Sequence, residues 1–220
     1  MNETLEIIRS EFAQASFETF EMVFISMAAA AVIGTLLGLV LHLTSNPLFY
    51  RNRIINGIAG TIVNIIRSMP FIILIIVLIP VTRILVGTSI GALAASVSLS
   101  IASIAFFAPL VENAFSEVDK GVIEAAVAAG AGTFLIIRKV LFVEAMPALV
   151  RALTVTFVSI IGYSAMAGAV GGGGIGNLAI MYGYNRYQTG VLLVTVVVLI
   201  IIVQLGQWIG DKIAMALTRK

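Results

Sequence analysis

The 220-residue sequence contains no cysteine, which excludes disulfide bonds and thiolate metal sites. Its single histidine, His42, leaves almost no material for a histidine-rich metal site or a Ser-His-Asp triad. Charged residues are also scarce, at 11% of the chain against about 25% in ordinary soluble domains. So few charges cannot cover a soluble surface, and hydrophobic residues make up 60% of the chain. The composition therefore predicts an integral membrane protein.

Long runs without charged residues locate the membrane-spanning segments. A helix needs roughly 20 apolar residues to cross about 30 Å of hydrocarbon. Five runs reach that length, although Arg67 interrupts the second. Because lipid offers the backbone no hydrogen-bond partners, these runs are expected to be helices. We predict a single all-α domain over residues 1–220, a bundle of five transmembrane helices near 20–42, 57–80, 90–111, 152–170 and 189–210.

The segments between the predicted spans differ in their content of Lys and Arg. The segments on one side, 43–53, 112–151 and 211–220, hold nine: Arg51, Arg53, Lys120, Arg138, Lys139, Arg151, Lys212, Arg219 and Lys220. The other side holds three, which are Arg9, Arg83 and Arg186. Cytoplasmic loops of membrane proteins carry an excess of positive residues. We therefore expect the N-terminus outside, the C-terminus in the cytoplasm, and segment 112–151 in the cytoplasm.

Within that segment, the sequence "EAAVAAGAGTFLIIRKVLFVEAMP" (124–147) predicts two short helices with a tight joint. Residues 118–129 favour helix, with Ser116 and Asp119 spaced as in a capping box. Glycines 130 and 132 predict a helix stop, and Thr133 can cap a second helix. That helix, over 134–142, is expected to end before Pro147.

A plain connection between two spans would need few residues, whereas about 40 are used here. Connections of this length are usually functional or disordered. Residues 112–151 are too apolar and too helix-prone to be disordered. They therefore predict a docking surface, and a merely structural connection is the alternative.

The residues of this segment resemble the cytoplasmic loop of bacterial ABC importer permeases. The motif begins with Glu124, Ala125, Ala126 and Gly130 and continues to Val140 and the "LFV" that follows, where the family usually has Leu-Pro in place of "FV". Three other blocks are similar to the methionine-importer permeases of this superfamily: "NIIRSMPFIILIIVLIP" (64–80), "VGTSIG" (86–91) and "GYSAMAGAVGGGGIGNLA" (162–179).

The resemblance implies a function and a set of partners. Its motif implies that Glu124, Ala125, Ala126, Gly130, Ala131 and Val140 couple the permease to a cytoplasmic ATPase. It also implies two ATPase subunits, an extracellular or periplasmic methionine-binding lipoprotein, and a bacterial cytoplasmic membrane location. Five helices are few for a gated path, so we expect a second copy of the chain as well. Lipid is a partner, and nucleic acid is not expected.

The energy source for transport is expected to lie in another chain. The sequence has no G-x-x-x-x-G-K-[ST] loop to hold phosphates, so we expect no cofactor here and ATP bound by a partner subunit. An ion-coupled carrier usually has ionisable residues in its spans, and Arg67 is the only clear one here. The chain is therefore predicted to be a non-catalytic transport subunit.

Three residues are candidates for the translocation path or its gate: Met166, Arg67 and Ser164. Arg67 has two interpretations, either lining the path at the helix break before Pro70 or reaching the cytoplasmic interface from a long helix. Met166 is either an apolar plug or ordinary packing. "GYS" at 162–164 lacks the second glycine of a nucleophile elbow and a nearby base, so an intramembrane hydrolase is not expected.

Glycine patterns predict contacts rather than chemistry. The run 171–176 matches G-x-G-x-x-G, but it follows a membrane span and not a strand, so we expect a flexible extracellular loop that caps the bundle and not a nucleotide site. The resemblance implies that this loop meets a substrate-binding protein. The pairs Gly34/Gly38 and Gly206/Gly210 are spaced for close helix packing.

The predicted function is the permease subunit of an ATP-driven amino-acid importer, with alternating access as the mechanism. The resemblance implies D- or L-methionine as the substrate. A permease for another small amino acid, or a membrane scaffold that recruits a cytoplasmic partner, are the alternatives.

Overall fold

The computed structural model describes residues 2–218, which form helices and no strand. Three of the elements are short π-helical turns, labelled η. In chain order the elements are α1 (Asn2–Ala29), η1 (Ala30–Gly34), α2 (Thr35–Ser45), α3 (Arg53–Ser68), α4 (Phe71–Val77), α5 (Ile79–Val86), α6 (Ala92–Ser116), α7 (Lys120–Ala128), α8 (Thr133–Ile136), η2 (Ile137–Leu141), α9 (Phe142–Ala169), α10 (Gly174–Leu178), η3 (Ala179–Tyr184) and α11 (Thr189–Thr218).

Four continuous helices are long and apolar enough to cross a membrane: Thr4–Ser45, Ala92–Ser116, Thr133–Ala169 and Thr189–Thr218. A fifth candidate is the pair α3 and α4, which meets the same test only when taken together and which bends by 109° at its break. The predicted all-helical membrane fold is therefore confirmed, and the predicted five spans are reached if the bent pair counts as one span. The first and fourth predicted spans are parts of longer helices.

The second predicted span, near 57–80, is wrong as one continuous helix. The backbone of Met69 is extended, with φ −83° and ψ 130°, and Pro70 follows it. A proline ring disfavours helical geometry in the residue before it. Proline also has no N–H to continue the helical ladder. The break at Pro70 turns α4 sharply away from α3.

The prediction that a helix ends before Pro147 is also wrong, because Pro147 lies inside α9. Helix α8 continues through η2 into α9 without a gap. A proline inside a helix costs about 3 kcal/mol. Ala145, Leu149 and Ala152 flank Pro147 on α9 and are buried in the same apolar cluster. Burial of this face offsets the cost, as neighbouring helices commonly do in membrane proteins.

Helix α6 lies at the centre of the bundle and contacts α1, α2 and α9. Gly38 lets α2 approach it closely, because a Cβ there would lie 2.5 Å from the Ala108 carbonyl oxygen. A Cβ at Gly34 would lie 2.9 Å from the Phe107 ring. On the other side, Gly206 and Gly210 of α11 face α9 in the same way. The predicted close helix contacts at both glycine pairs are confirmed.

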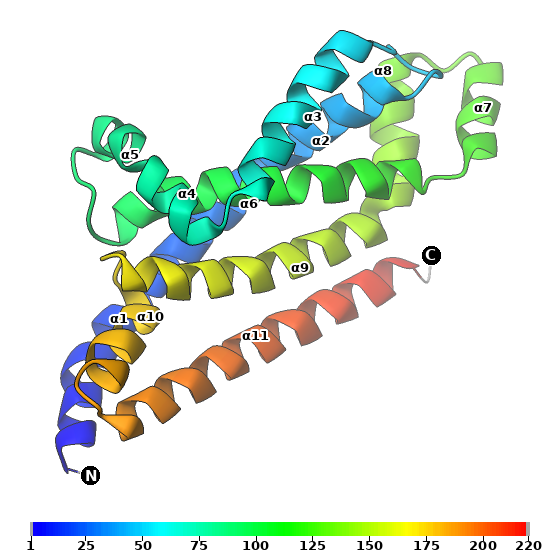
Figure 1. The fold of residues 1–220 in the computed structure, drawn as a ribbon. Helices are drawn as coiled ribbons and strands as arrows, with labels where there is room; N and C mark the ends of the chain where they lie inside the picture. The colour runs from blue at the N-terminus through cyan, green and yellow to red at the C-terminus, as the bar shows by residue number, and fades with distance from the viewer. Residues whose placement is uncertain (1, 219–220) are drawn as a thin grey trace.

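The elements gather at two opposite ends of the bundle (Figure 1). What we call the α7 end holds α7, α8, the loop between α2 and α3, and the C-terminal turn of α11. The α10 end holds the start of α1, together with α5 and α10.

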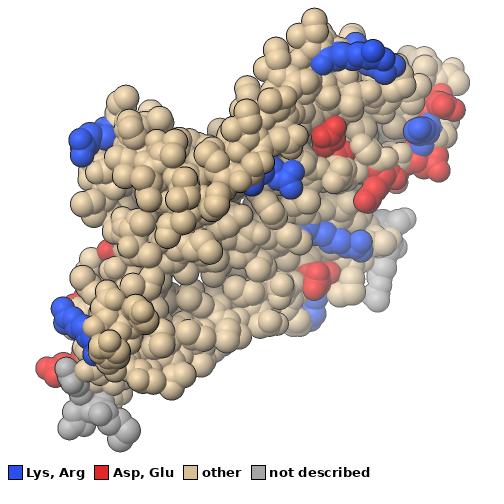
Figure 2. Space-filling view, viewed as in Figure 1, with Lys and Arg blue, Asp and Glu red and all other residues tan. Residues whose placement is uncertain are grey.

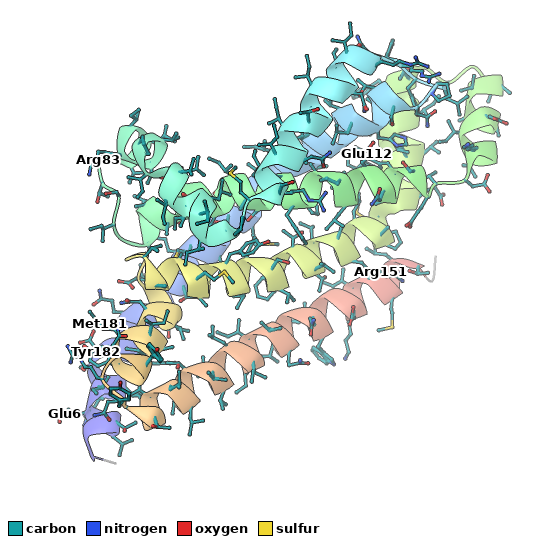
Figure 3. All side chains as sticks on the ribbon, in the orientation of Figure 1. Glu6, Arg83, Glu112, Arg151, Met181 and Tyr182 are labelled. Atoms are coloured by element: carbon teal, nitrogen blue, oxygen red, sulfur yellow. The ribbon has the colours of Figure 1, made fainter. Side chains whose placement is uncertain are left out.

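Charged side chains are concentrated toward the two ends of the bundle. Glu112 and Arg151 lie toward the α7 end, whereas Glu6 and Arg83 lie toward the α10 end (Figure 3). Much of the surface between the ends is uncharged (Figure 2), as a lipid-facing surface requires. Arg219 and Lys220, which entered the count of positive residues, lie outside the described residues.

Candidate functional site

Helix α7 begins at an aspartate cap. The Asp119 side chain accepts a hydrogen bond from the Gly121 N–H at 2.6 Å. Such a bond satisfies one of the free N–H groups at a helix start. Ser116, in contrast, is the last residue of α6, and its hydroxyl donates to the Glu112 carbonyl at 2.8 Å. The predicted capping box from Ser116 is therefore wrong, since Asp119 directly precedes the helix and caps it.

Helix α7 ends in a glycine stop, as predicted. Gly130 has φ +81°, a conformation that favours glycine. Its N–H donates to the Val127 carbonyl at 2.9 Å, and the Ala131 N–H donates to the Ala126 carbonyl at 3.0 Å. These two bonds form a Schellman motif. Gly132 then leads into α8, so the prediction that Thr133 caps this helix is wrong by one position.

One face of α7 is fixed to the bundle. Ile123 is 2% exposed and lies in an apolar cluster with Phe115 of α6 and Leu141 of η2. Ala126, Ala131 and Val140 pack against this cluster. Three of the six predicted coupling residues therefore face inward and support the segment.

The opposite face of α7 is open. Glu124, Ala125 and Gly130 are exposed, and a Cβ at Gly130 would meet nothing within 4 Å. These are the other three predicted coupling residues. Large apolar side chains are exposed beside them, namely Val122, Val127, Phe134 and Leu135.

These exposed apolar residues lie on α7 and at the start of a helix that is longer than a bilayer requires. Helix Thr133–Ala169 has 37 residues, which at 1.5 Å per residue is about 55 Å, well above the roughly 30 Å of a bilayer core. At least one end therefore extends beyond the hydrocarbon core, and α7 and α8 lie at the N-terminal end of this helix. An exposed apolar patch outside the lipid is typical of a protein interaction site. Sequence reasoning missed these four residues, because in an apolar chain they do not stand out.

Beside Glu124 the surface is hollowed between the α2–α3 loop and α7. The hollow has a volume of about 480 Å³ and includes His42, Lys120 and Glu124 in its lining. The His42 ring packs between Phe49 and Phe115, and its Nδ1 lies 3.2 Å from the Ser116 hydroxyl. His42 thus ties the end of α2 to the end of α6.

Arg67 lines a second hollow, inside the spanning part of the bundle. This pocket has a volume of about 190 Å³ and is lined by Ile66, Arg67, Met69, Phe71, Leu74, Ala102, Phe106 and Tyr163. Phe71 stacks on Tyr163 with ring centroids 4.8 Å apart. Ala102 and Phe106 lie near the middle of α6. This position at mid-span favours the interpretation of Arg67 as a path residue over one that reaches the interface.

The pocket does not bring the three path candidates together. Ser164 is buried, and its hydroxyl donates to the Ile161 carbonyl of its own helix at 2.8 Å. Met166 is half-exposed on α9. Among the described residues, Tyr163 is the member of this part of α9 that lines the Arg67 pocket. Its position next to Ser164 in the sequence gave no signal of that role.

The glycine run at 171–174 is held in place, contrary to the expected flexible loop. The Gly174 N–H donates to a Glu18 carboxylate oxygen at 2.7 Å, and the Ile175 N–H donates to the Thr19 hydroxyl at 2.8 Å. The Gly91 N–H donates to the Gly171 carbonyl at 2.9 Å. Positive φ angles at 171, 173 and 174 explain why these positions are glycines.

Fold and site together define a multi-pass membrane protein with a helical segment projecting at one end. The family model for "Binding-protein-dependent transport system inner membrane component" matches residues 30–219. The chain belongs to this family. It is therefore a non-catalytic membrane permease subunit, and ATP hydrolysis belongs to a separate subunit.

Relatives in the same family carry more specific names. The chain is 47% identical over 199 residues to the "Probable D-methionine transport system permease protein MetI" of Vibrio cholerae, covering 90% of this chain and 88% of the relative. It is 48% identical over 204 residues to the "Methionine import system permease protein MetP" of Bacillus subtilis, covering 93% and 92%.

Solved structures agree with the fold. A structure described as "Inward facing conformations of the MetNI methionine ABC transporter" matches with a TM-score of 0.90 and 44% identity, covering 94% of this chain and 95% of that chain. An amino acid ABC transporter matches with a TM-score of 0.76 at 19% identity, covering 93% of each chain, and supports the fold alone.

Proposed function

We propose that the chain is the permease subunit of an ATP-driven methionine importer, working as a homodimer with two cytoplasmic ATPase subunits. The observation that carries the proposal is the α7 segment, which is anchored by one face and open on the other. The names of the relatives, which are methionine permeases, support the substrate.

The open face of α7 suits a close-fitting protein partner. Ala125 and Gly130 are small, so a partner backbone can approach closely, and Glu124 offers a carboxylate to a basic group or to N–H donors. The exposed Val127 and Phe134 add apolar area around them. An ATPase subunit could therefore dock on this face from the cytoplasm without contacting the membrane-spanning helices.

Movement of the docked ATPase would reach the spans through the cluster under α7. Ile123 contacts a cluster that includes Phe115 at the end of α6 and Leu141 just before α9. The Phe115 and Phe142 rings lie 5.0 Å apart, edge to face, and join these two helices. A shift of α7 therefore displaces the ends of α6 and α9 together. ATP binding would thereby open the bundle outward, and hydrolysis would reset it.

The excess of positive residues on the segments at the α7 end supports an orientation with that end in the cytoplasm and the N-terminus outside. The α10 end then faces a methionine-binding lipoprotein on the outer side. Arg67 and the pocket around it lie between the two ends. In a homodimer, two such pockets would flank a path along the two-fold axis, with Met166 as an apolar gate candidate.

Co-purification tests the proposal. The tagged chain is expressed with the ATP-binding-cassette protein encoded beside it, in three forms: wild type, Ala125→Asp and Ala216→Asp. Ala125 lies on the open face of α7, whereas Ala216 is an exposed alanine at the end of α11. We expect the ATPase to co-purify with wild type and Ala216→Asp and to be lost with Ala125→Asp.

Loss of the ATPase from both variants, or from neither, contradicts docking at α7. If no ATPase co-purifies with wild type, the chain has no energy source of the proposed kind. The scaffold alternative then gains support. Uptake of labelled methionine into proteoliposomes, compared with uptake of other small amino acids, tests the substrate.

A further inference from the structure

The helix α3 presents two different exposed faces in the membrane. At 100° per residue, Gly57, Gly60, Asn64 and Arg67 recur every three or four positions and share one face. Isoleucines share the neighbouring face, and they are Ile54, Ile58, Ile62 and Ile65. The four isoleucines are exposed on the protomer, as are Gly57, Asn64 and Arg67, and Gly60 is half-buried. We call the first the polar face of α3 and the second its isoleucine face.

A third side of α3 packs on the bundle. Val63 is 3% exposed, and the Asn56 side chain donates to the Leu41 carbonyl at 2.9 Å. The polar face is therefore not the packing side of the helix. A Cβ at Gly57 or Gly60 would meet nothing within 4 Å, so the space in front of these glycines is open.

The two exposed faces suit different solvents. Isoleucine side chains are favourable against lipid. An asparagine and an arginine are costly in hydrocarbon, and inside membranes such residues usually face a bundle interior or a water-filled cavity. The polar face of α3 therefore indicates water, and the isoleucine face indicates lipid.

The polar face leads to the Arg67 pocket at the break before α4. Arg67 is the only charged residue among the described side chains that line this hollow. The rest of the lining is apolar or aromatic, with the stacked pair Phe71 and Tyr163 and the thioether of Met69. A guanidinium binds a carboxylate through paired hydrogen bonds. Aromatic rings and a thioether suit an uncharged, polarisable side chain.

We propose that the polar face of α3 is a water-exposed wall of the translocation path, and that Arg67 binds the carboxylate of the passing amino acid. The apolar side chain of the substrate then lies against Tyr163 and Phe71. This inference rests on the proposed permease function and assigns a substrate-contacting pocket within it. It also gives a role to a charged residue whose pocket offers no acidic partner among the described residues.

Thiol labelling tests the wall with matched controls. The chain has no cysteine, so each single-cysteine variant carries one label site in this chain. Asn64→Cys and Gly60→Cys report on the polar face, and Ile62→Cys and Ile65→Cys report on the isoleucine face. The permease–ATPase complex is treated with a small membrane-impermeant methanethiosulfonate, and modification of the permease chain is followed by mass spectrometry.

We expect the polar-face variants to react about tenfold faster or more than the isoleucine-face variants, because a thiol in apolar surroundings stays protonated and unreactive. Equal rates on the two faces, or an inert polar face, overturn the wall. If the ATPase still co-purifies with the permease in that case, the proposed permease function is unaffected. Loss of the ATPase from the cysteine-free parent would instead count against that function.

Protection by ligand tests the role of Arg67. Labelling of Asn64→Cys, one turn from Arg67, is repeated with methionine or with methionine amide, which keeps the side chain and lacks the carboxylate. We expect methionine to slow labelling and the amide not to. In the double variant Asn64→Cys with Arg67→Met, methionine should no longer protect, whereas Arg67→Lys should keep part of the protection. Equal protection by methionine and its amide, or protection by neither, overturns carboxylate binding at Arg67.

Discussion

Glycine with the same backbone conformation is used in opposite ways at the two ends of the bundle. Gly130 at the α7 end has φ +81° and open space where a Cβ would be. Gly174 at the α10 end has φ +80°, and a Cβ there would lie 2.7 Å from the Thr19 hydroxyl. The Glu18 carboxylate accepts the Gly174 N–H. One end is therefore closed by its own side chains, and the other is left open.

This contrast teaches how to separate structure from function in a chain with few polar residues. Gly174 is satisfied within the protomer, so its role is to let α10 pack against α1. Gly130 ends α7 and leaves its outer face uncovered, although the inner face is fixed by Ile123. An ordered but uncovered surface outside the lipid is the part of the molecule that needs a partner.

The largest expected effect comes from adding a methyl group at the closed end. Gly174→Ala combines strain at positive φ with overlap against Thr19, and should lower the free energy of unfolding by about 3–5 kcal/mol. Gly130→Ala has the same φ and no overlap, and should cost about 1–2 kcal/mol. Thermal unfolding in detergent measures both. Equal losses for the two variants would show that the two ends are not packed differently.

Removing the anchor under α7 should have the next largest effect. Ile123→Ala leaves a cavity in the apolar cluster and should cost about 2–4 kcal/mol. The outer face is unchanged, so the ATPase should still co-purify while substrate transported per ATP hydrolysed falls. Ile213→Ala, an exposed isoleucine near the end of α11, serves as the control. If the ratio of substrate transported to ATP hydrolysed is unchanged in Ile123→Ala, the apolar cluster under α7 does not transmit the coupling.

The hydrogen bond between Glu18 and the glycine run can be weakened without changing the size of the side chain. Glu18→Gln replaces a charge-assisted hydrogen bond to Gly174 by a neutral one and should cost about 1–2 kcal/mol. Glu11→Gln removes a similar charge from the same helix, two turns away, and should be near neutral. Faster amide exchange at 174–178 in Glu18→Gln only would support the role of this hydrogen bond in holding α10. The same exchange change in both variants would point to an effect of net charge.

The smallest effect is expected at the start of α7. Asp119→Ala removes the cap on the Gly121 N–H and should cost about 0.5–2 kcal/mol of local stability. Hydrogen exchange of the first turn of α7 measures it, with Glu117→Ala as the control. If the two variants exchange alike, Asp119 does not hold the helix start.

Local features of the molecule were predictable from the sequence, and contacts between distant residues were not. The spans follow from charge-free runs, and the stop at Gly130 follows from glycine chemistry within a few residues. The bond from Gly174 to Glu18 joins positions 156 residues apart, which no local pattern reveals.

Proline shows the limit of local rules most clearly. Pro70 breaks a helix as expected of its chemistry, with a bend of 109° between α3 and α4. Pro147 does not break one, because Ala145 and Leu149 are buried on either side of it. The two prolines differ in their packing and not in their immediate chemistry. The same holds for the candidate site, where Ala125 faces outward and Ala126 inward, and for Tyr163, whose place in the Arg67 pocket depends on the fold.

Cross-linking from adjacent positions on α7 tests the central claim most directly. Ala125→Cys lies on the open face and Ala126→Cys on the face that packs against the bundle. Each variant is assembled with the ATPase in membranes and treated with a short thiol-to-amine cross-linker. The account predicts a permease–ATPase product from Ala125→Cys and little or none from Ala126→Cys. Equal products from both positions, or a product from Ala126→Cys alone, would contradict docking on the outer face of α7.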